Sequence, residues 1–255
     1  MIQQSCPVRN VEQVAENIFV LTFVSPSIAA AVSPGQFVNI KTDAGIEPML
    51  RRPFSVYFAE GQELKIIFNV IGKGTAALRW KKPGETIDVL GPLGVPFGLD
   101  NREFDTAILV GGGLGVAPLP LATRKLKLDG KNVVTYLGAR TAAVVTPQHL
   151  DNVRVATDDG SEGYHGNVVD LLKHELQGLK SSRPRVFACG PTAMLKALQR
   201  LVVEHGIPCE ASLEGPMGCG FGICQGCPVE LAGGEKKYAL MCKDGPTFDI
   251  SRIRL

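Results

Sequence analysis

Apolar and polar residues alternate through the first third of the chain, which predicts short β-strands separated by turns. We expect strands at residues 18–24, 36–41, 54–58, 64–71 and 86–90. In the fourth of these, positions 64, 66, 68 and 70 form one apolar face. Gly-containing pairs at 34–35, 60–61 and 83–84 mark turns. This spacing, from about residue 14 to residue 92, is typical of an antiparallel β-barrel.

The pattern changes near residue 100, where strands begin to alternate with helices. Residues 106–110 form a continuous apolar run, as in a strand buried on both faces. We expect further strands at 133–137, 153–157 and 185–188. We expect one helix that ends at about residue 128, a short helix near 147–150, and two more helices over 168–176 and 192–204. Such β-α-β-α repetition predicts a doubly wound parallel sheet.

The last quarter predicts a strand at 208–213 and then a small β-hairpin. Its strands, 228–231 and 237–240, flank the Gly233-Gly234 turn. The chain is therefore expected to have a mixed β and α/β fold in three domains. These are an antiparallel barrel over 1–100, a parallel α/β sheet over 101–210 and a small hairpin domain over 211–255.

Charge adds mainly exclusions. The chain has 27 Lys and Arg against 25 Asp and Glu, without a basic cluster, so neither nucleic acid nor a membrane surface is an expected partner. The first residues do not resemble a signal peptide, and the longest uncharged stretch, 107–123, is short and broken by glycine and proline. We expect a soluble protein in the reducing cytoplasm, where seven cysteines would stay free of disulfides.

Four cysteines carry the sharpest chemical signal. Cys219, Cys224 and Cys227 follow a C-x4-C-x2-C spacing, and Cys242 returns after the hairpin. This spacing matches the plant-type pattern for a [2Fe–2S] cluster, and interleaved glycines would let a loop wrap it closely. A structural zinc site, in a nucleotide-sensing module without enzymatic activity, is the alternative. Three ligands crowded into nine residues favour the cluster.

Several weaker motifs suit phosphate groups. Arg51-Arg52-Pro53-Phe54-Ser55 is by itself an ordinary strand entrance. Gly74-Thr75 opens a short helix whose free N–H groups could meet an anion, or it is only a capped turn. Gly111-Gly112-Gly113-Leu114-Gly115 permits close approach of a dinucleotide but departs from the G-x-G-x-x-G register.

Taken in order, these motifs resemble the ferredoxin–NADP reductase superfamily. The resemblance implies that Arg52 pairs with the FAD pyrophosphate, that Gly74 and Thr75 cradle the same phosphates, and that Ser55 lies beside the flavin ring. The remaining residues that it implies for FAD are Pro53, Phe54, Asn69, Val70 and Ile71. For the nicotinamide dinucleotide it implies Gly111, Gly112, Gly113 and Gly115, with Cys189, Gly190 and Pro191 at the nicotinamide end. The residues themselves do not distinguish NAD from NADP.

The whole chain is similar to the PyrK family, the electron-transfer subunits of class 1B dihydroorotate dehydrogenases. The cysteine loop and Cys242-Lys243-Asp244-Gly245-Pro246 are the most specific parts of the match. The resemblance implies FAD, NAD and one [2Fe–2S] cluster held by Cys219, Cys224, Cys227 and Cys242. It also implies that a separate FMN-containing subunit oxidises dihydroorotate in pyrimidine biosynthesis, in a heterotetramer of two plus two subunits.

Because the cofactors supply the chemistry, we expect no catalytic general base in this chain. Related NAD(P)H-linked subunits of ferredoxin oxidoreductases and sulfhydrogenases are the alternative assignment.

Overall fold

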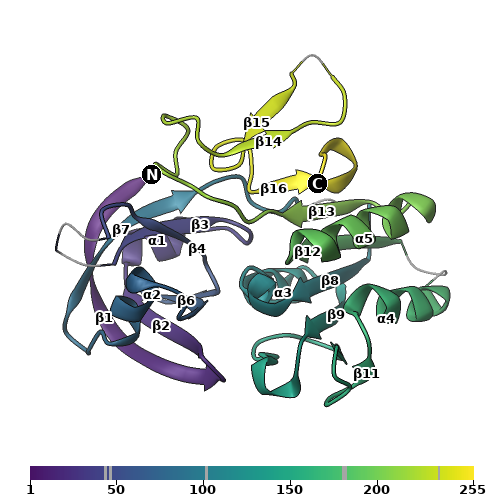
Figure 1. Cartoon of the computed structure of the whole chain (residues 1–255), viewed down its shortest axis with the longest axis horizontal. Helices are drawn as coiled ribbons and strands as arrows, with labels where there is room; N and C mark the ends of the chain where they lie inside the picture. The colour runs from purple at the N-terminus through teal and green to yellow at the C-terminus, as the bar shows by residue number, and fades with distance from the viewer. Residues whose placement is uncertain (43–44, 46–47, 101–102, 180–182, 235) are drawn as a thin grey trace.

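The computed structural model describes residues 1–42, 45, 48–100, 103–179, 183–234 and 236–255. Two seven-stranded sheets lie side by side, and the C-terminal hairpin lies over the junction between them (Figure 1). The expected mixed β and α/β fold is confirmed. Among the described residues, no helix is long and apolar enough to cross a membrane.

The first sheet is antiparallel throughout and curls into a barrel. Its strands, in the order β4-β3-β7-β1-β2-β6-β5, are β1 (Ile2–Ala15), β2 (Ile18–Val24), β3 (Phe37–Lys41), β4 (Arg52–Ser55), β5 (Phe58–Glu60), β6 (Glu63–Asn69) and β7 (Thr86–Leu93). The edge strand β4 approaches β6, the neighbour of the other edge strand, where Phe54 contacts Phe68 with ring centroids 6.1 Å apart. Inward residues such as Val38, Ile40 and Ile66 are fully buried, each contributing about 1.5–3 kcal/mol of transfer free energy.

The barrel differs from the prediction in two places. The strand predicted at 54–58 is two strands, β4 and β5, at opposite ends of the sheet order. The break falls at Val56 and Tyr57, whose N–H groups donate to Gln36, just before β3, and to Lys65 on β6. The first strand, β1, was not predicted. Its polar residues and Pro7 weaken the strand signal, although pairing with both β7 and β2 makes it the central strand of the sheet.

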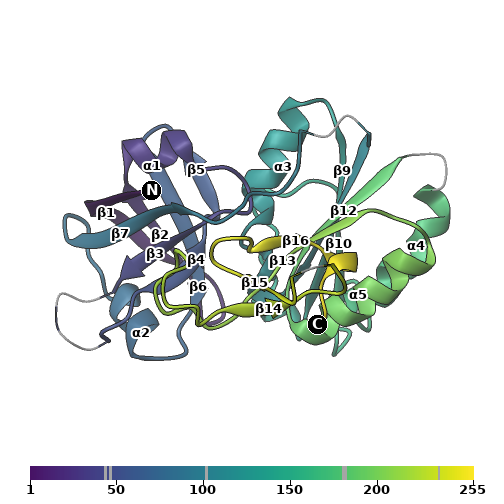
Figure 2. The same ribbon diagram turned by 90° about the horizontal axis from the view of Figure 1, so that it is seen from above.

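Two short helices complete this part of the chain. Helix α1 (Pro26–Ala31) follows β2, and α2 (Lys73–Arg79) follows β6. Figure 2 shows both at the periphery of the barrel, away from the second sheet.

The second sheet has the order β11-β10-β9-β8-β12-β13-β16 and is parallel except for β16. Its strands are β8 (Thr106–Gly112), β9 (Asn132–Ala139), β10 (Val153–Thr157), β11 (Tyr164–His165), β12 (Pro184–Cys189), β13 (Cys209–Ser212) and β16 (Thr247–Asp249). The strand order reverses between β8 and β12, which defines a switch point of the kind where such sheets bind ligands.

Helices cover both faces of this sheet. The helix α3 (Leu119–Leu128) packs on Ala107 and Leu109, whereas α4 (Val168–Glu175) and α5 (Thr192–Glu204) pack on Ile108 and Val110. Figure 1 shows α3 on the barrel side and α4 and α5 on the other. Short 3₁₀ helices are η1 (Gly113–Val116), η2 (Ala142–Val144), η3 (Leu176–Leu179) and η4 (Ile250–Arg252). The helix expected near 147–150 is wrong: His149 adopts φ +63° in a turn there.

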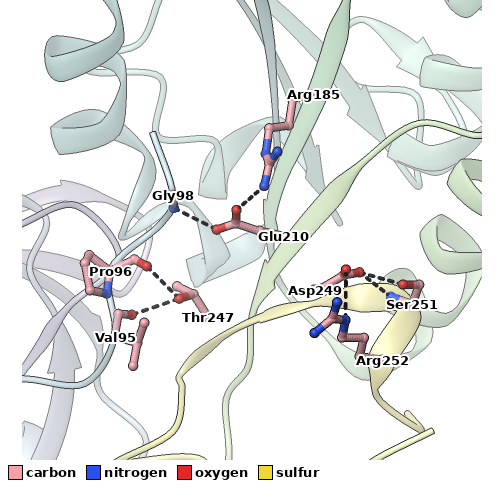
Figure 3. A network of polar contacts seen from close by, with 9 residues as sticks. All are labelled: Val95, Pro96, Gly98, Arg185, Glu210, Thr247, Asp249, Ser251 and Arg252. Atoms are coloured by element: carbon pink, nitrogen blue, oxygen red, sulfur yellow. Dashed lines mark hydrogen bonds and ion pairs between the residues drawn. The ribbon is translucent and has the colours of Figure 1, made fainter. Parts of the chain in front are cut away.

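The C-terminal segment joins the two sheets. After β13 it forms the cysteine loop and the hairpin β14 (Pro228–Glu230) and β15 (Tyr238–Leu240), and then returns as β16, antiparallel to β13. On its return it forms hydrogen bonds with the connection from β7 to β8 (Figure 3). The Thr247 hydroxyl lies 2.8 Å from the Val95 carbonyl and 2.9 Å from that of Pro96. Glu210 accepts from the Gly98 N–H at 2.8 Å and pairs with Arg185 at 2.6 Å.

Candidate functional site

A cavity of about 380 Å³ opens where the barrel, the parallel sheet and the C-terminal segment meet. Residues from all three parts line it, including Leu114 and Ala117 from the sheet and Glu214 and Gly215 from the C-terminal segment. The residues predicted for FAD that line the cavity are Pro53, Phe54, Ser55, Asn69, Ile71 and Thr75. Apolar walls with a few polar groups are typical of a cofactor site.

Arg52 and Gly74 lie next to each other and adjoin the lining residues Pro53 and Thr75 along the chain, although neither lines the cavity itself. A Cβ added to Gly74 would lie 3.5 Å from the Arg52 side chain and 3.3 Å from the Thr42 hydroxyl. Thr42 is fully buried and its hydroxyl lacks a hydrogen-bond partner among the described residues. A guanidinium, a spare hydroxyl and a bare helix start together fit a phosphate. Sequence reasoning missed Thr42, because only the fold brings the end of β3 to this point.

The neighbouring arginine has a different role. Arg51 pairs with Asp88 at 2.6 Å and also donates to the Asp88 carbonyl, so it is held on the barrel. The Thr75 hydroxyl accepts from the N–H groups of Ile71 and Gly72 and therefore shapes the helix start. Val70 lies outside the cavity lining and packs against the barrel core.

At the switch point of the parallel sheet, the two glycine turns predicted for the dinucleotide pack against each other. Strand β8 continues through Gly111 and Gly112, two residues further than expected. A Cβ on Gly115 would lie 2.1 Å from the Cys189 carbonyl oxygen, so only glycine fits there. Gly113 has φ +54° and open space beside it, as expected for backbone that faces a ligand.

Cys189 and Glu214 form a close pair beside the first cavity, which Glu214 lines. The Cys189 thiol is fully buried and lies 3.9 Å from a Glu214 carboxylate oxygen. Burial, followed by the Glu214 charge, raises the pKa of the Cys189 thiol well above its usual range. Exclusion of water by the surrounding protein also raises the pKa of Glu214. Sequence reasoning missed Glu214, although an acidic residue just past a parallel strand near the switch point is a recognisable signal.

A second cavity, of about 430 Å³, lies at the carboxyl ends of β9 and β10. Gly138, Asp158 and Asn167 line it, as does Pro191 from the turn after β12. Asp158 thus brings a carboxylate to the edge of the sheet where a dinucleotide is expected. Within this turn Gly190 packs closely against the end of β8, since an added Cβ would lie 3.0 Å from the Gly112 nitrogen.

The four predicted cysteine ligands lie in two pairs. The sulfur atoms of Cys227 and Cys242 are 3.3 Å apart. Cys219 accepts from the Cys224 backbone N–H at 3.5 Å and from the Cys224 thiol. Two pairs of thiolates suit two irons with two thiolates each. Across the described residues, no three His, Cys, Asp or Glu side chains converge as they would around one ion.

Backbone groups close around these sulfurs. The Phe221 and Cys224 N–H groups point at the Cys219 sulfur, each at 3.5 Å, and the Cys242 N–H points at the Cys227 sulfur at 3.5 Å. Burial raises the pKa of Cys219, but the N–H groups of Cys224 and Phe221 outweigh it and lower the pKa to about 6. Burial and the Cys227 thiol raise the pKa of Cys242 to about 12. A loop that already favours one thiolate, with N–H groups aimed at sulfur, fits an iron–sulfur cluster.

Comparisons with known proteins agree with this geometry. Residues 214–254 match the family model of the iron–sulfur cluster binding domain of dihydroorotate dehydrogenase B. The chain is 42% identical over 250 residues to the dihydroorotate dehydrogenase B (NAD(+)) electron transfer subunit of Geobacillus thermodenitrificans, covering 95% of both chains. It is 38% identical to the subunit of that name from Bacillus cereus, covering all of both chains.

Solved structures show the same fold. One chain from the NADH-dependent reduced ferredoxin–NADP oxidoreductase, studied for flavin-based electron bifurcation, superposes with a TM-score of 0.86 at 31% identity. The match covers 98% of this chain and 89% of that one. A ferredoxin–NADP⁺ reductase from Neisseria gonorrhoeae with bound FAD and NADP superposes with a TM-score of 0.66 at 16% identity, over 80% of this chain and 92% of that one.

Proposed function

This chain belongs to the family of electron transfer subunits of dihydroorotate dehydrogenase B (NAD⁺), and from that premise we propose that it links dihydroorotate oxidation to NAD⁺ reduction. In this proposal a separate FMN-containing subunit oxidises dihydroorotate in the cytoplasm, in an assembly of two plus two subunits. The observation that carries the proposal is that two cysteine pairs lie in the segment that follows Met217, a residue that lines the cavity shared by the barrel and the parallel sheet.

The proposal assigns one cofactor site to each domain. The barrel, residues 1–100, would hold FAD, with Arg52 and Gly74 on its phosphates and Ser55 beside its ring. The parallel sheet, residues 101–210, would bind NAD at Gly111–Gly115 and at the turn of Cys189, Gly190 and Pro191. Residues 211–255 would hold a [2Fe–2S] cluster through Cys219, Cys224, Cys227 and Cys242.

When bound, these groups exchange electrons as hydride at the nicotinamide and singly at the cluster, and the flavin can do both. The chain itself contributes positioning. The Arg52 guanidinium would hold the diphosphate, and the contact of Gly115 with Cys189 lets the two dinucleotide turns close on one ligand. Burial raises the pKa of the Cys189 thiol and of the Glu214 carboxyl, and Glu214 lines the cavity proposed for the flavin.

The cysteine loop is proposed as the side that meets the partner subunit. Its Ile223 side chain is 74% exposed and Phe221 is 37% exposed, although both are apolar. Apolar side chains at the tip of a redox loop suit contact with another subunit. At this surface Cys224 is exposed and Cys219 is half-buried, whereas Cys227 and Cys242 are buried, so electrons would enter on the side of the first pair.

The direct test is co-expression with the neighbouring FMN-containing subunit, followed by an assay of dihydroorotate-dependent NAD⁺ reduction. Replacing Cys224 with alanine should remove the cluster and abolish this coupled turnover, while FAD binding and oxidation of NADH by the flavin persist. Coupled turnover that survives in Cys224→Ala would contradict the assignment of the cysteine loop as the electron entrance.

A second candidate is an NAD(P)H-linked subunit of a ferredoxin oxidoreductase. The observation behind it is the 31% identity with the reduced ferredoxin–NADP oxidoreductase chain. The identity with the dihydroorotate dehydrogenase subunit is higher, at 42%. Assays of the purified complex with dihydroorotate and with reduced ferredoxin separate the two. Turnover with ferredoxin alone would favour this second candidate.

A further inference from the structure

A single buried asparagine connects the barrel to the cysteine loop. Asn39 lies on β3, where its backbone pairs with Pro53 of β4, a residue of the flavin motif. Its neighbours Val38 and Ile40 point into the barrel core, so the Asn39 side chain points outward. It is nevertheless only 1% exposed.

The Asn39 amide ends on a proposed cluster ligand. Its Nδ2 donates to the backbone carbonyl of Cys219 at 3.0 Å. Its Oδ1 is buried and has no partner among the described residues, so the Cys219 carbonyl decides which way the amide faces. The next residue, Gly220, has φ +84°, and a Cβ there would lie 2.0 Å from Asn39 Nδ2. The loop is thus shaped to let this amide approach its backbone.

We propose that Asn39 is a positioning residue that holds the Cys219 peptide in the orientation that the cluster site requires. The inference rests on the proposed function of the cysteine loop. A peptide fixed at its carbonyl also fixes the start of the following turn, whose Phe221 and Cys224 N–H groups aim at the Cys219 sulfur. Hydrogen bonds to cluster sulfurs set the reduction potential. Asn39 would therefore act on the cluster through Cys219 and orient the cysteine loop against β3, the strand that pairs with β4.

The test compares Asn39→Leu, which keeps the size and removes the amide, with the matched control Gln36→Leu. Gln36 also donates its amide to a backbone carbonyl, that of Gly94 at 2.8 Å, and within the described part of the chain its side chain has no hydrogen bond to the cysteine loop. Iron, sulfide and FAD are quantified first. Dithionite-reduced protein is then examined by electron paramagnetic resonance and redox titration, and cluster loss to a chelator is timed.

We expect Asn39→Leu to bind FAD and assemble the cluster, to shift its reduction potential and resonance spectrum, and to lose iron several-fold faster. Gln36→Leu should match the wild type in all three. Unchanged values in Asn39→Leu would overturn the proposal. If that variant does not fold, Asn39→Ser replaces it, and loss of FAD binding in both would show that Asn39 only supports the barrel. Wild-type protein without iron and sulfide would instead overturn the proposed function itself.

Discussion

At the scale of single residues, the two adjacent arginines differ in the contacts that their side chains make. Arg51 is held by Asp88 on the barrel wall, whereas Arg52 lies beside Gly74 and the unpartnered Thr42 hydroxyl. The two residues are indistinguishable in the sequence, and the resemblance alone chose Arg52. In the structure Arg51 precedes β4 and pairs with Asp88, whereas Arg52 begins the strand, and the assignment of Arg52 to FAD stays a prediction.

We expect Arg52→Ala to weaken FAD binding roughly 10- to 100-fold, because a charge-assisted hydrogen bond contributes about 1.5–3 kcal/mol. Lysine at this position should restore part of the affinity, since it keeps the charge without the fork of donors. Fluorescence titration of flavin-stripped protein measures the effect. In Arg51→Ala, where only the pair with Asp88 is lost, FAD affinity should stay at the wild-type value. Equal losses in both variants would contradict the distinction.

Asp158 gives a second prediction at this scale, on the choice between NAD and NADP. Its carboxylate lines the cavity at the end of β10, where it can accept from a ribose hydroxyl and repel a 2′-phosphate. Asp158→Ser should therefore raise the preference for NADPH over NADH by roughly tenfold, or about 1.4 kcal/mol. Steady-state reduction of FAD by each nucleotide measures it.

The adjacent aspartate is the matched control. Asp159 accepts from the N–H and hydroxyl of Ser161 at 3.0 and 2.6 Å, so its charge is used within its own turn. The Ser161 hydroxyl and N–H lower the pKa of Asp159. The preference between NADH and NADPH should be unchanged in Asp159→Ser. If this preference shifts as much in Asp159→Ser as in Asp158→Ser, the assignment of Asp158 to the ribose of the nucleotide is wrong.

At the scale of elements, the switch point depends on two turns touching. Gly115 in η1 lies against the Cys189 carbonyl at the end of β12, and an added methyl group would meet backbone that cannot rotate away. We expect Gly115→Ala to lower the free energy of unfolding by about 1–3 kcal/mol and to weaken NADH binding, measured by thermal unfolding and by titration. Gly178→Ala, at an exposed position with open space around it, should change neither. Tight NADH binding by Gly115→Ala would contradict a role for this contact.

How far the sequence predicts these elements depends on how local their cause is. Helix α5 was predicted at its observed bounds because its apolar stripe is continuous, and β10 because it is short and bounded by turns. Strand β1 was missed because partners on both sides, rather than its own polar residues, stabilise it. The same holds for the site. Cysteine spacing is a local signal, and the position of Glu214 just past β13 is a weaker one, whereas Thr42 and Asn39 gain their positions only from tertiary contacts.

At the scale of the whole molecule, the C-terminal segment does more than carry cysteines. Residues after Cys242 run back between the two sheets, pair with β13 as β16 and hold the connection that leads from the barrel to the parallel sheet (Figure 3). A three-residue strand carries too weak a pattern for this return to be predicted. The segment proposed for the cluster is therefore tied to the joint that sets the barrel against the nucleotide sheet.

Thr247 tests this connection. Its hydroxyl serves the carbonyls of Val95 and Pro96 and is 6% exposed, so Thr247→Val keeps the volume and leaves both carbonyls without this donor. The loss should lower the free energy of unfolding by about 1–3 kcal/mol and speed amide exchange in residues 94–99 and in β16. Hydrogen exchange followed by mass spectrometry measures both segments.

The control is Thr123→Val, which removes a buried hydrogen bond from the Thr123 hydroxyl to the Leu119 carbonyl within α3 alone. If the joint is held elsewhere, the two variants will destabilise the protein equally and exchange at 94–99 will stay at the wild-type rate. Faster exchange confined to Thr247→Val would show that the end of the chain fixes the arrangement of the two sheets around the shared cavity.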